Sequence, residues 1–238
     1  MAARPEDRAL LWPLYAFNLE IARACWASAE PLVAQMRLQF WADVIEDAAG
    51  GEPPRAHEVA APLAGLVTSG TVPAPALLEM VEARHSEASR AAFESPEALH
   101  RFLDGSAASL MWAAARALGA ADTAETTVRD AGFAAGAASL LVALPEIEAR
   151  GWRPLPAPAD EAVLAGLSAE ALTRLSRARA GRGAIPRRAL PALLAGWRSR
   201  ARLRTARDDP ARVRAGLLEG SEFERRASLL WRSLTGRW

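Results

Sequence analysis

Apolar residues recur along the chain at intervals of three and four positions, the spacing of one face of an α-helix. Ala, Leu, Arg and Glu are the commonest residues, and all four favour helices. No segment shows the strict alternation that is typical of a β-strand. We therefore predict an all-α protein of about eight or nine helices, separated by proline- and glycine-containing breaks. These breaks fall at residues 30–31, 50–54, 70–75, 95–96, 119–122, 151–158, 181–186 and 208–210.

One predicted helix has unusual packing potential. Residues 130–144 read DAGFAAGAASLLVAL, with small residues at Gly132, Ala135, Gly136 and Ser139. Small side chains allow a close approach between backbones, so this helix is expected at the centre of a bundle. There Gly136 and Ser139 would line a cavity for a long apolar ligand. A tightly packed central helix without a cavity is the alternative, and the apolar run is shorter than the ~20 residues of a membrane span.

The composition is that of one globular domain over residues 1–238. Hydrophobic residues make up 51% of the chain and charged residues 24%. Neither an internal repeat nor a low-complexity linker divides it. The single cysteine, Cys25, excludes an intramolecular disulfide and fits a reducing compartment. Without a recognisable secretory signal, we expect a cytoplasmic protein, bacterial in origin.

Charge is distributed unevenly along the chain. Residues 1–150 contain 11 Arg and 20 acidic residues, a net charge of −9, whereas residues 151–238 contain 18 Arg and 8 acidic residues, a net charge of +10. The basic part could face the acidic part of the same molecule, an anionic membrane surface or a phosphorylated ligand. Internal pairing is the favoured interpretation. Nucleic-acid binding is not expected, because the Arg-rich stretch 174–214 lacks an aromatic platform or a known motif.

Four segments, taken in order, resemble the squalene/phytoene synthase family. They are LYAFNLEIARACW at 14–26, MRLQFWADVIE at 36–46, ALHRFLDGSAASLMWAAARALG at 98–119 and AGFAAGAASLLVALPEIEARGWRPLP at 131–156, and LLWRSLTGRW at 229–238 continues the match. The resemblance implies an isoprenoid-synthase bundle around a central apolar cavity. Active members join two prenyl diphosphates there, using two aspartate-rich motifs.

Those motifs hold magnesium ions, which neutralise the charge that develops on the departing diphosphate. Mg²⁺ prefers hard oxygen ligands such as carboxylates. The resemblance places the first motif at Ala22, Arg23 and Trp26 and the second at Ala143 and Ile147. None of these side chains is a carboxylate. The resemblance therefore implies the family's non-catalytic branch, which includes a mitochondrial complex I assembly factor, and no cofactor is expected.

Membership of this branch would imply an assembly or accessory factor with a protein partner. Asn18 and Glu20 are typical variants of that branch, and residues 142–145 read VALP where the branch has Arg-Ala-Leu-Pro. An isoprenoid-like lipid could occupy the cavity, in contact with Tyr15, Asn18 and Glu87. A simple lipid carrier is a further alternative.

The main alternative is an active head-to-head prenyltransferase that binds Mg²⁺ through relocated carboxylates. Its ligands would come from Asp43, Asp47, Glu87 and Glu146. Asp43 and Asp47 have i,i+4 spacing, which places both on one helix face. They lie just before Gly50-Gly51, however, so a solvated helix end is the favoured interpretation.

Two further segments have open interpretations. Arg37 could bind a phosphate through both guanidinium nitrogens, or it could pair with an acid on a neighbouring helix while Phe40 and Trp41 fill the core. The C-terminal stretch 229–238 could lie on the inner-membrane surface as an amphipathic helix, or it could dock on the bundle, which we favour.

Overall fold

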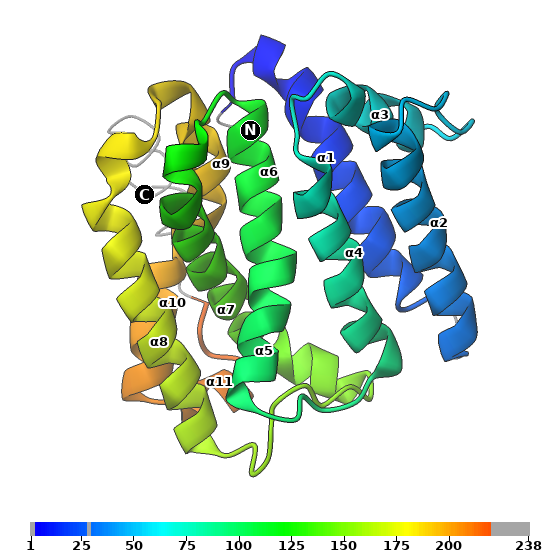
Figure 1. Cartoon of the computed structure of the whole chain (residues 1–238). Coiled ribbons are helices and arrows are strands. Elements are labelled where there is room, and N and C mark those ends of the chain that lie inside the picture. The colour runs from blue at the N-terminus through cyan, green and yellow to red at the C-terminus, as the bar shows by residue number, and fades with distance from the viewer. Residues whose placement is uncertain (1–2, 28–29, 220–238) are drawn as a thin grey trace.

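Every regular element in the described part of the chain, residues 3–27 and 30–219, is helical (Figure 1), as the sequence predicts. The coordinates are a computed structural model. A five-residue π-helix, η1 (Asp104–Ala108), joins α5 to α6 without a break. The α-helices are α1 Pro5–Ala24, α2 Pro31–Ala49, α3 Ala60–Thr68, α4 Ala74–Ser89, α5 Pro96–Leu103, α6 Ser109–Ala117, α7 Glu125–Ala149, α8 Glu161–Ala180, α9 Leu190–Leu193, α10 Ser199–Asp208 and α11 Ala211–Arg214.

Two helices of the described part begin at a residue whose side chain caps them. The Ser95 hydroxyl accepts a hydrogen bond of 3.3 Å from the Ala98 backbone N–H, and Pro96 occupies the first position of α5. Asp160 caps α8 in the same way, by accepting from the Val163 N–H at 3.1 Å. These side chains satisfy backbone donors that a helix leaves unpaired in its first turn.

Helix α7 is the central element of the bundle. It contacts α6 and η1 on one side and α8 and α10 on the other. In Figure 1, α2 lies at one edge of the molecule and α8 at the other, with α4, α6 and α7 between them. Helix α1 packs against α2, α3, α4 and α6. The apolar core therefore runs across the whole row of helices.

The contact between α7 and η1 is close enough to require glycine. A Cβ atom added at Gly132 would lie 2.6 Å from the Cα of Ala108, and one added at Gly136 would lie 2.5 Å from the Cβ of Ala107. Real Cβ atoms do not approach so closely. Gly136 therefore packs directly on η1, and a cavity beside it stays a prediction. Ser139, the other predicted cavity residue, is exposed.

By length and composition, one helical stretch, Asp122–Ala149, could cross a membrane. Of its most apolar 18-residue window, 56% is buried inside the molecule. The same stretch contains α7, which packs against α6, η1, α8 and α10 as the core helix of the bundle. A buried core helix can be as long and as apolar as a membrane span, so packing explains the composition of this stretch.

Ion pairs link the acidic and basic parts of the chain, the interpretation favoured from the charge pattern. Arg177 binds Asp130 through two hydrogen bonds of 3.0 Å. Three more pairs cross between the two parts: Arg188 with the buried Asp7 at 2.7 Å, Arg174 with Asp104 at 2.6 Å, and Arg214 with Glu148 at 3.1 Å. Paired charges of this kind hold α8 and the segments after it against the first half of the fold.

Candidate functional site

The end of α1 meets the end of α4 through a polar contact between residues distant in sequence. The indole nitrogen of Trp26 donates a hydrogen bond of 2.7 Å to the Glu87 carboxylate. Arg84 forms an ion pair with the same carboxylate and donates to the amide oxygen of Asn18 at 3.3 Å. Glu87 is only 6% exposed. Its negative charge is therefore balanced within the protein by one guanidinium and one indole N–H.

An aromatic cluster continues from Trp26 into the interior. The ring of Trp26 lies 6.5 Å from that of Trp152, which in turn contacts Phe93 and Phe102, each at 6.1 Å between centroids. Trp152 is 2% exposed, and its indole N–H donates to the Ala91 carbonyl at 2.9 Å. Large rings thus fill the space between the ends of α1 and α4 and the loop after α7.

This cluster connects the two segments where the family's metal motifs are expected. Trp26 belongs to the first segment, and the backbone N–H of Trp152 donates to the carbonyl of Ile147, in the second, at 3.2 Å. Ala143 and Ile147 lie on the last turns of α7, which continues through Pro145 to Ala149. Both are half-buried. The structure therefore brings the two segments together through Trp152, a residue that the sequence analysis did not single out.

The donors at this position do not fit a magnesium ion. Ala22 has no donor atom, and Arg23 is exposed and pairs with Glu20 at 3.3 Å. The buried carboxylate at this position, Glu87, is already bound by Arg84 and Trp26. Mg²⁺ needs several oxygen ligands in near-octahedral geometry. Across residues 3–27 and 30–219, no three His, Cys, Asp or Glu side chains are grouped so that they could hold a metal ion.

The four carboxylates of the enzyme alternative are bound to three different arginines. Arg55 contacts both Asp43 and Asp47, at 3.4 and 2.8 Å. Glu146 pairs with Arg150, the residue that follows the end of α7. Together with Glu87, these acids lie at three places and do not converge on one cavity. The favoured interpretation of Asp43 and Asp47 as a helix end agrees with their position in the last two turns of α2.

Two other titratable side chains, Tyr15 in the middle of α1 and Cys25 at its C-terminal end, have a raised pKa because of burial. Burial, followed by the negative charge of Glu87, raises the pKa of Cys25 to about 12. The thiol donates to the Ile21 and Arg84 carbonyls at 3.4 and 3.5 Å. Burial also raises the pKa of Tyr15. A nucleophilic thiol must lose its proton near neutral pH, so Cys25 is suited to packing and not to covalent chemistry.

The remaining predicted residues fall outside this cluster. Arg37 is exposed on α2, and within the described residues no acid forms an ion pair with it. Trp41 is buried and Phe40 packs against the core, as expected. A phosphate contact of Arg37 stays a prediction. The C-terminal stretch 229–238 lies outside the described residues.

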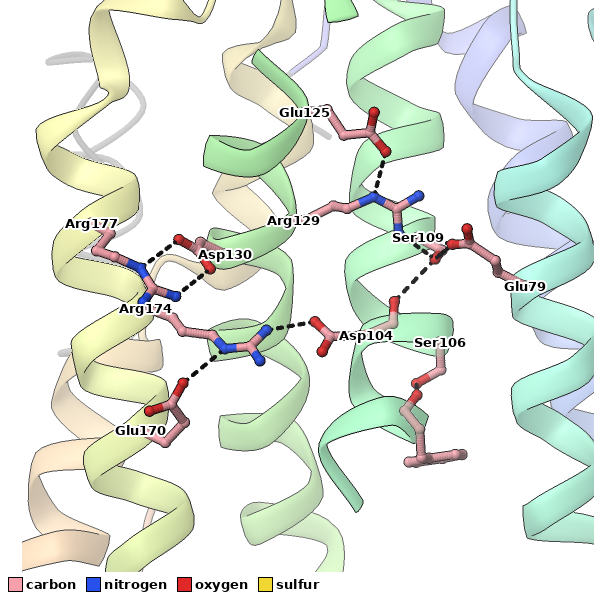
Figure 2. A network of polar contacts seen from close by, with 11 residues as sticks. Glu79, Asp104, Ser106, Ser109, Glu125, Arg129, Asp130, Glu170, Arg174 and Arg177 are labelled. Carbon is pink, nitrogen blue, oxygen red and sulfur yellow. Dashed lines mark hydrogen bonds and ion pairs between the residues drawn. The ribbon is translucent and has the colours of Figure 1, made fainter. Parts of the chain in front are cut away.

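A second polar network, which the sequence analysis missed, ties α4, η1, α6, α7 and α8 together (Figure 2). Arg174 binds Asp104 at 2.6 Å and Glu170 at 3.0 Å, and its guanidinium lies 3.8 Å from the centre of the Phe133 ring. Arg129 of α7 binds Glu125 of the same helix at 2.7 Å and Glu79 of α4 at 2.8 Å. The i,i+4 pairs within each helix are visible in sequence, but the partners across helices are not.

The Ser109 hydroxyl completes this network beside the π-helix. It donates to the Glu79 carboxylate at 2.6 Å and lies 3.0 Å from the Asp104 carbonyl. A π-helix disturbs the regular pairing of backbone carbonyls, and such segments often occur at functional sites. Here every charged member of the network has a partner of opposite charge. The arrangement therefore serves to fix the register of neighbouring helices.

Comparisons with known proteins agree with this architecture. Residues 1–160 match the model of the squalene/phytoene synthase family. The proteins named NADH dehydrogenase (ubiquinone) complex I, assembly factor 6, from Bos taurus and Homo sapiens are 27% and 28% identical to this chain. The matches cover 73% and 71% of this chain and 52% and 50% of theirs, so the chain spans about half the length of these curated relatives.

A solved structure shows the same fold. The crystal structure of a dehydrosqualene synthase in complex with ligand superposes with a TM-score of 0.76. The superposition covers 98% of this chain and 88% of that chain, at 14% sequence identity. At this identity the likeness shows the fold alone, which is the isoprenoid synthase fold expected from sequence.

Proposed function

The chain belongs to the squalene/phytoene synthase family, and we propose that within this family it acts as a non-catalytic assembly or accessory factor for respiratory complex I. The matched relatives carry the name of a complex I assembly factor, which supports a protein partner in an assembly pathway. The proposal needs no cofactor. The protein would act in the cytoplasm or at the surface of the inner membrane.

The observation that carries the proposal is the contact of Trp26 and Arg84 with Glu87 at the end of α1. Trp26 stands where the family resemblance puts a metal ligand, and it binds the nearby carboxylate of Glu87. Arg84 compensates the charge of that carboxylate. A cation would have to compete with this guanidinium, and removing one partner of a buried ion pair is strongly unfavourable. The aromatic ring of Trp26 also packs edge-on against that of Trp152, at 6.5 Å between centroids.

A binding measurement tests the non-catalytic part. The purified full chain would be titrated with a non-hydrolysable farnesyl diphosphate analogue in a calorimeter, with and without Mg²⁺. An active dehydrosqualene synthase serves as the positive control. We expect no Mg²⁺-dependent heat from this protein. Tight binding that requires Mg²⁺ would contradict the proposal and favour the prenyltransferase with relocated ligands. Binding that is equal with and without Mg²⁺ would indicate a lipid site without metal chemistry.

A genetic measurement tests the assembly part. The gene would be deleted in its own host, and assembled complex I would be quantified on native gels with complex II as the control. We expect less assembled complex I and unchanged complex II, with recovery on re-expression of the wild-type chain. Unchanged complex I in the deletion strain would contradict the assembly role while leaving the binding result intact.

A further inference from the structure

We propose that the groove between α8 and α10 is a binding site for a phosphate-bearing ligand. The two helices pack side by side (Figure 1), and the groove between them has a volume of about 440 Å³. Its lining combines four arginines with two leucines and contains no acidic residue. The lining residues are Leu172, Leu175, Ser176 and Arg179 from α8 and Arg200, Arg204 and Arg207 from α10.

The arginines of α10 reach the groove because of their spacing. Arg200, Arg204 and Arg207 are separated by four and three residues, so all three lie on one face of the helix. Opposite them, Leu172, Leu175 and Arg179 follow the same spacing along α8. The two faces meet at the groove. The side of the groove formed by α10 is therefore cationic, and the side formed by α8 is partly apolar.

Arg200 and Arg204 differ from the arginines of the basic part that pair with the acidic part. Arg174, Arg177, Arg188 and Arg214 each bind a carboxylate of the acidic part. Arg200 and Arg204, by contrast, are exposed, and no ion pair joins either of them to an acid within residues 3–27 and 30–219. Among the residues that the structure describes, the ion pair of Arg207 is with its neighbour Asp208. Two guanidinium groups in one groove thus keep their hydrogen-bonding capacity for a ligand.

A phosphate group fits the chemistry of this lining. A guanidinium group binds phosphate oxygens through two parallel N–H donors, and several arginines around one groove can share a dianion. Leu172 and Leu175 provide apolar surface for the glycerol or alkyl part of a phosphate ester. Nucleic acid is disfavoured, because no aromatic side chain lines the groove for base stacking. A phospholipid headgroup and a soluble phosphate ester share the required chemistry.

The test compares two double variants that remove the same charge. Arg200→Gln with Arg204→Gln changes the groove, and Arg101→Gln with Arg153→Gln changes exposed arginines elsewhere on the surface. Co-sedimentation of the full chain would be measured with vesicles of phosphatidylglycerol and phosphatidylcholine and with phosphatidylcholine alone. A calorimetric titration with glycerol 3-phosphate would measure binding of a soluble phosphate ester. Neither substituted pair takes part in an ion pair among the described residues, so both variants should fold.

We expect the groove variant to lose binding by about tenfold or more, since two charge-assisted contacts are removed. The surface variant should bind as the wild type does. Loss of vesicle binding assigns the site to a lipid headgroup, and loss of glycerol 3-phosphate binding assigns it to a soluble ester. Equal weakening of both variants, unchanged binding by the groove variant, or no binding of either probe by the wild type would overturn the proposal. Tighter binding of single-stranded RNA at the same arginines would also overturn it. The proposal does not depend on the assembly role.

Discussion

The Trp26 indole donates a hydrogen bond of 2.7 Å to the Glu87 carboxylate across 61 residues of sequence. Glu87, a candidate magnesium ligand from the sequence, thus accepts hydrogen bonds from the Trp26 indole and the Arg84 guanidinium. A buried carboxylate needs such compensation, because an unpaired charge in the interior is strongly destabilising. The contact therefore ties α1 to α4 and determines what the end of α1 can bind.

Replacing Glu87 with Gln should destabilise the protein by roughly 2–4 kcal/mol, because Arg84 would keep its charge without a carboxylate partner. Urea denaturation followed by circular dichroism measures the change. Glu82→Gln on the exposed side of the same helix is the matched control and should have little effect. Equal stability of the two variants would show that the buried pair does not support the fold.

Replacing Gly132 with Ala should destabilise the bundle by about 1–3 kcal/mol through overpacking. The new Cβ would lie 2.6 Å from the Cα of Ala108, which is backbone and cannot rotate away. Gly166→Ala on α8 is the control, since a Cβ there meets nothing within 4 Å. It should stabilise the helix by about 0.5–1 kcal/mol. Thermal melting of both variants should give opposite shifts, and a higher melting temperature for Gly132→Ala would refute the close contact.

Replacing Arg174 with Lys should cost about 1–2 kcal/mol, because an ammonium group cannot reproduce the planar contacts to two carboxylates and an aromatic ring. Arg174 binds Asp104 and Glu170 and lies over Phe133. Chemical denaturation checks the change, with the exposed Arg182→Lys as its control. If both lysine variants unfold alike, charge alone accounts for the role of Arg174.

Stability should fall as the pH rises above about 9. The pKa of Cys25 is raised from an ordinary value of 9.0 to about 12 in the folded protein. A raised folded-state pKa gives a contribution that is complete below pH 9 and is lost as the pH approaches 12. Tyr15 has a raised pKa as well and acts in the same direction. The free energy of unfolding of wild type and Cys25→Ala should be compared from pH 8 to 11. We expect a shallower decline for the variant, and parallel curves would contradict the assignment to Cys25.

The sequence by itself determined the helical class, several helix starts and the family. The three- and four-residue periodicity encodes helices locally, and Ser95-Pro96 caps α5 as predicted, because capping involves neighbours within one turn. The ordered segments of the family resemblance predicted the isoprenoid synthase fold, which the superposition confirms. The charge asymmetry predicted internal pairing, and the bonds from Arg177 to Asp130 confirm it.

Only the tertiary structure decided which distant groups meet. No local pattern couples Trp26 to Glu87, or Trp152 to the rings around it, because these contacts depend on how α1, α4 and the loop after α7 pack. The same holds at Gly136, where a small residue is compatible with a cavity or with a close helix contact. In the structure Gly136 lies in close contact with Ala107 of the π-helix. Secondary structure is fixed by interactions between near neighbours, whereas a site depends on the relative placement of whole helices.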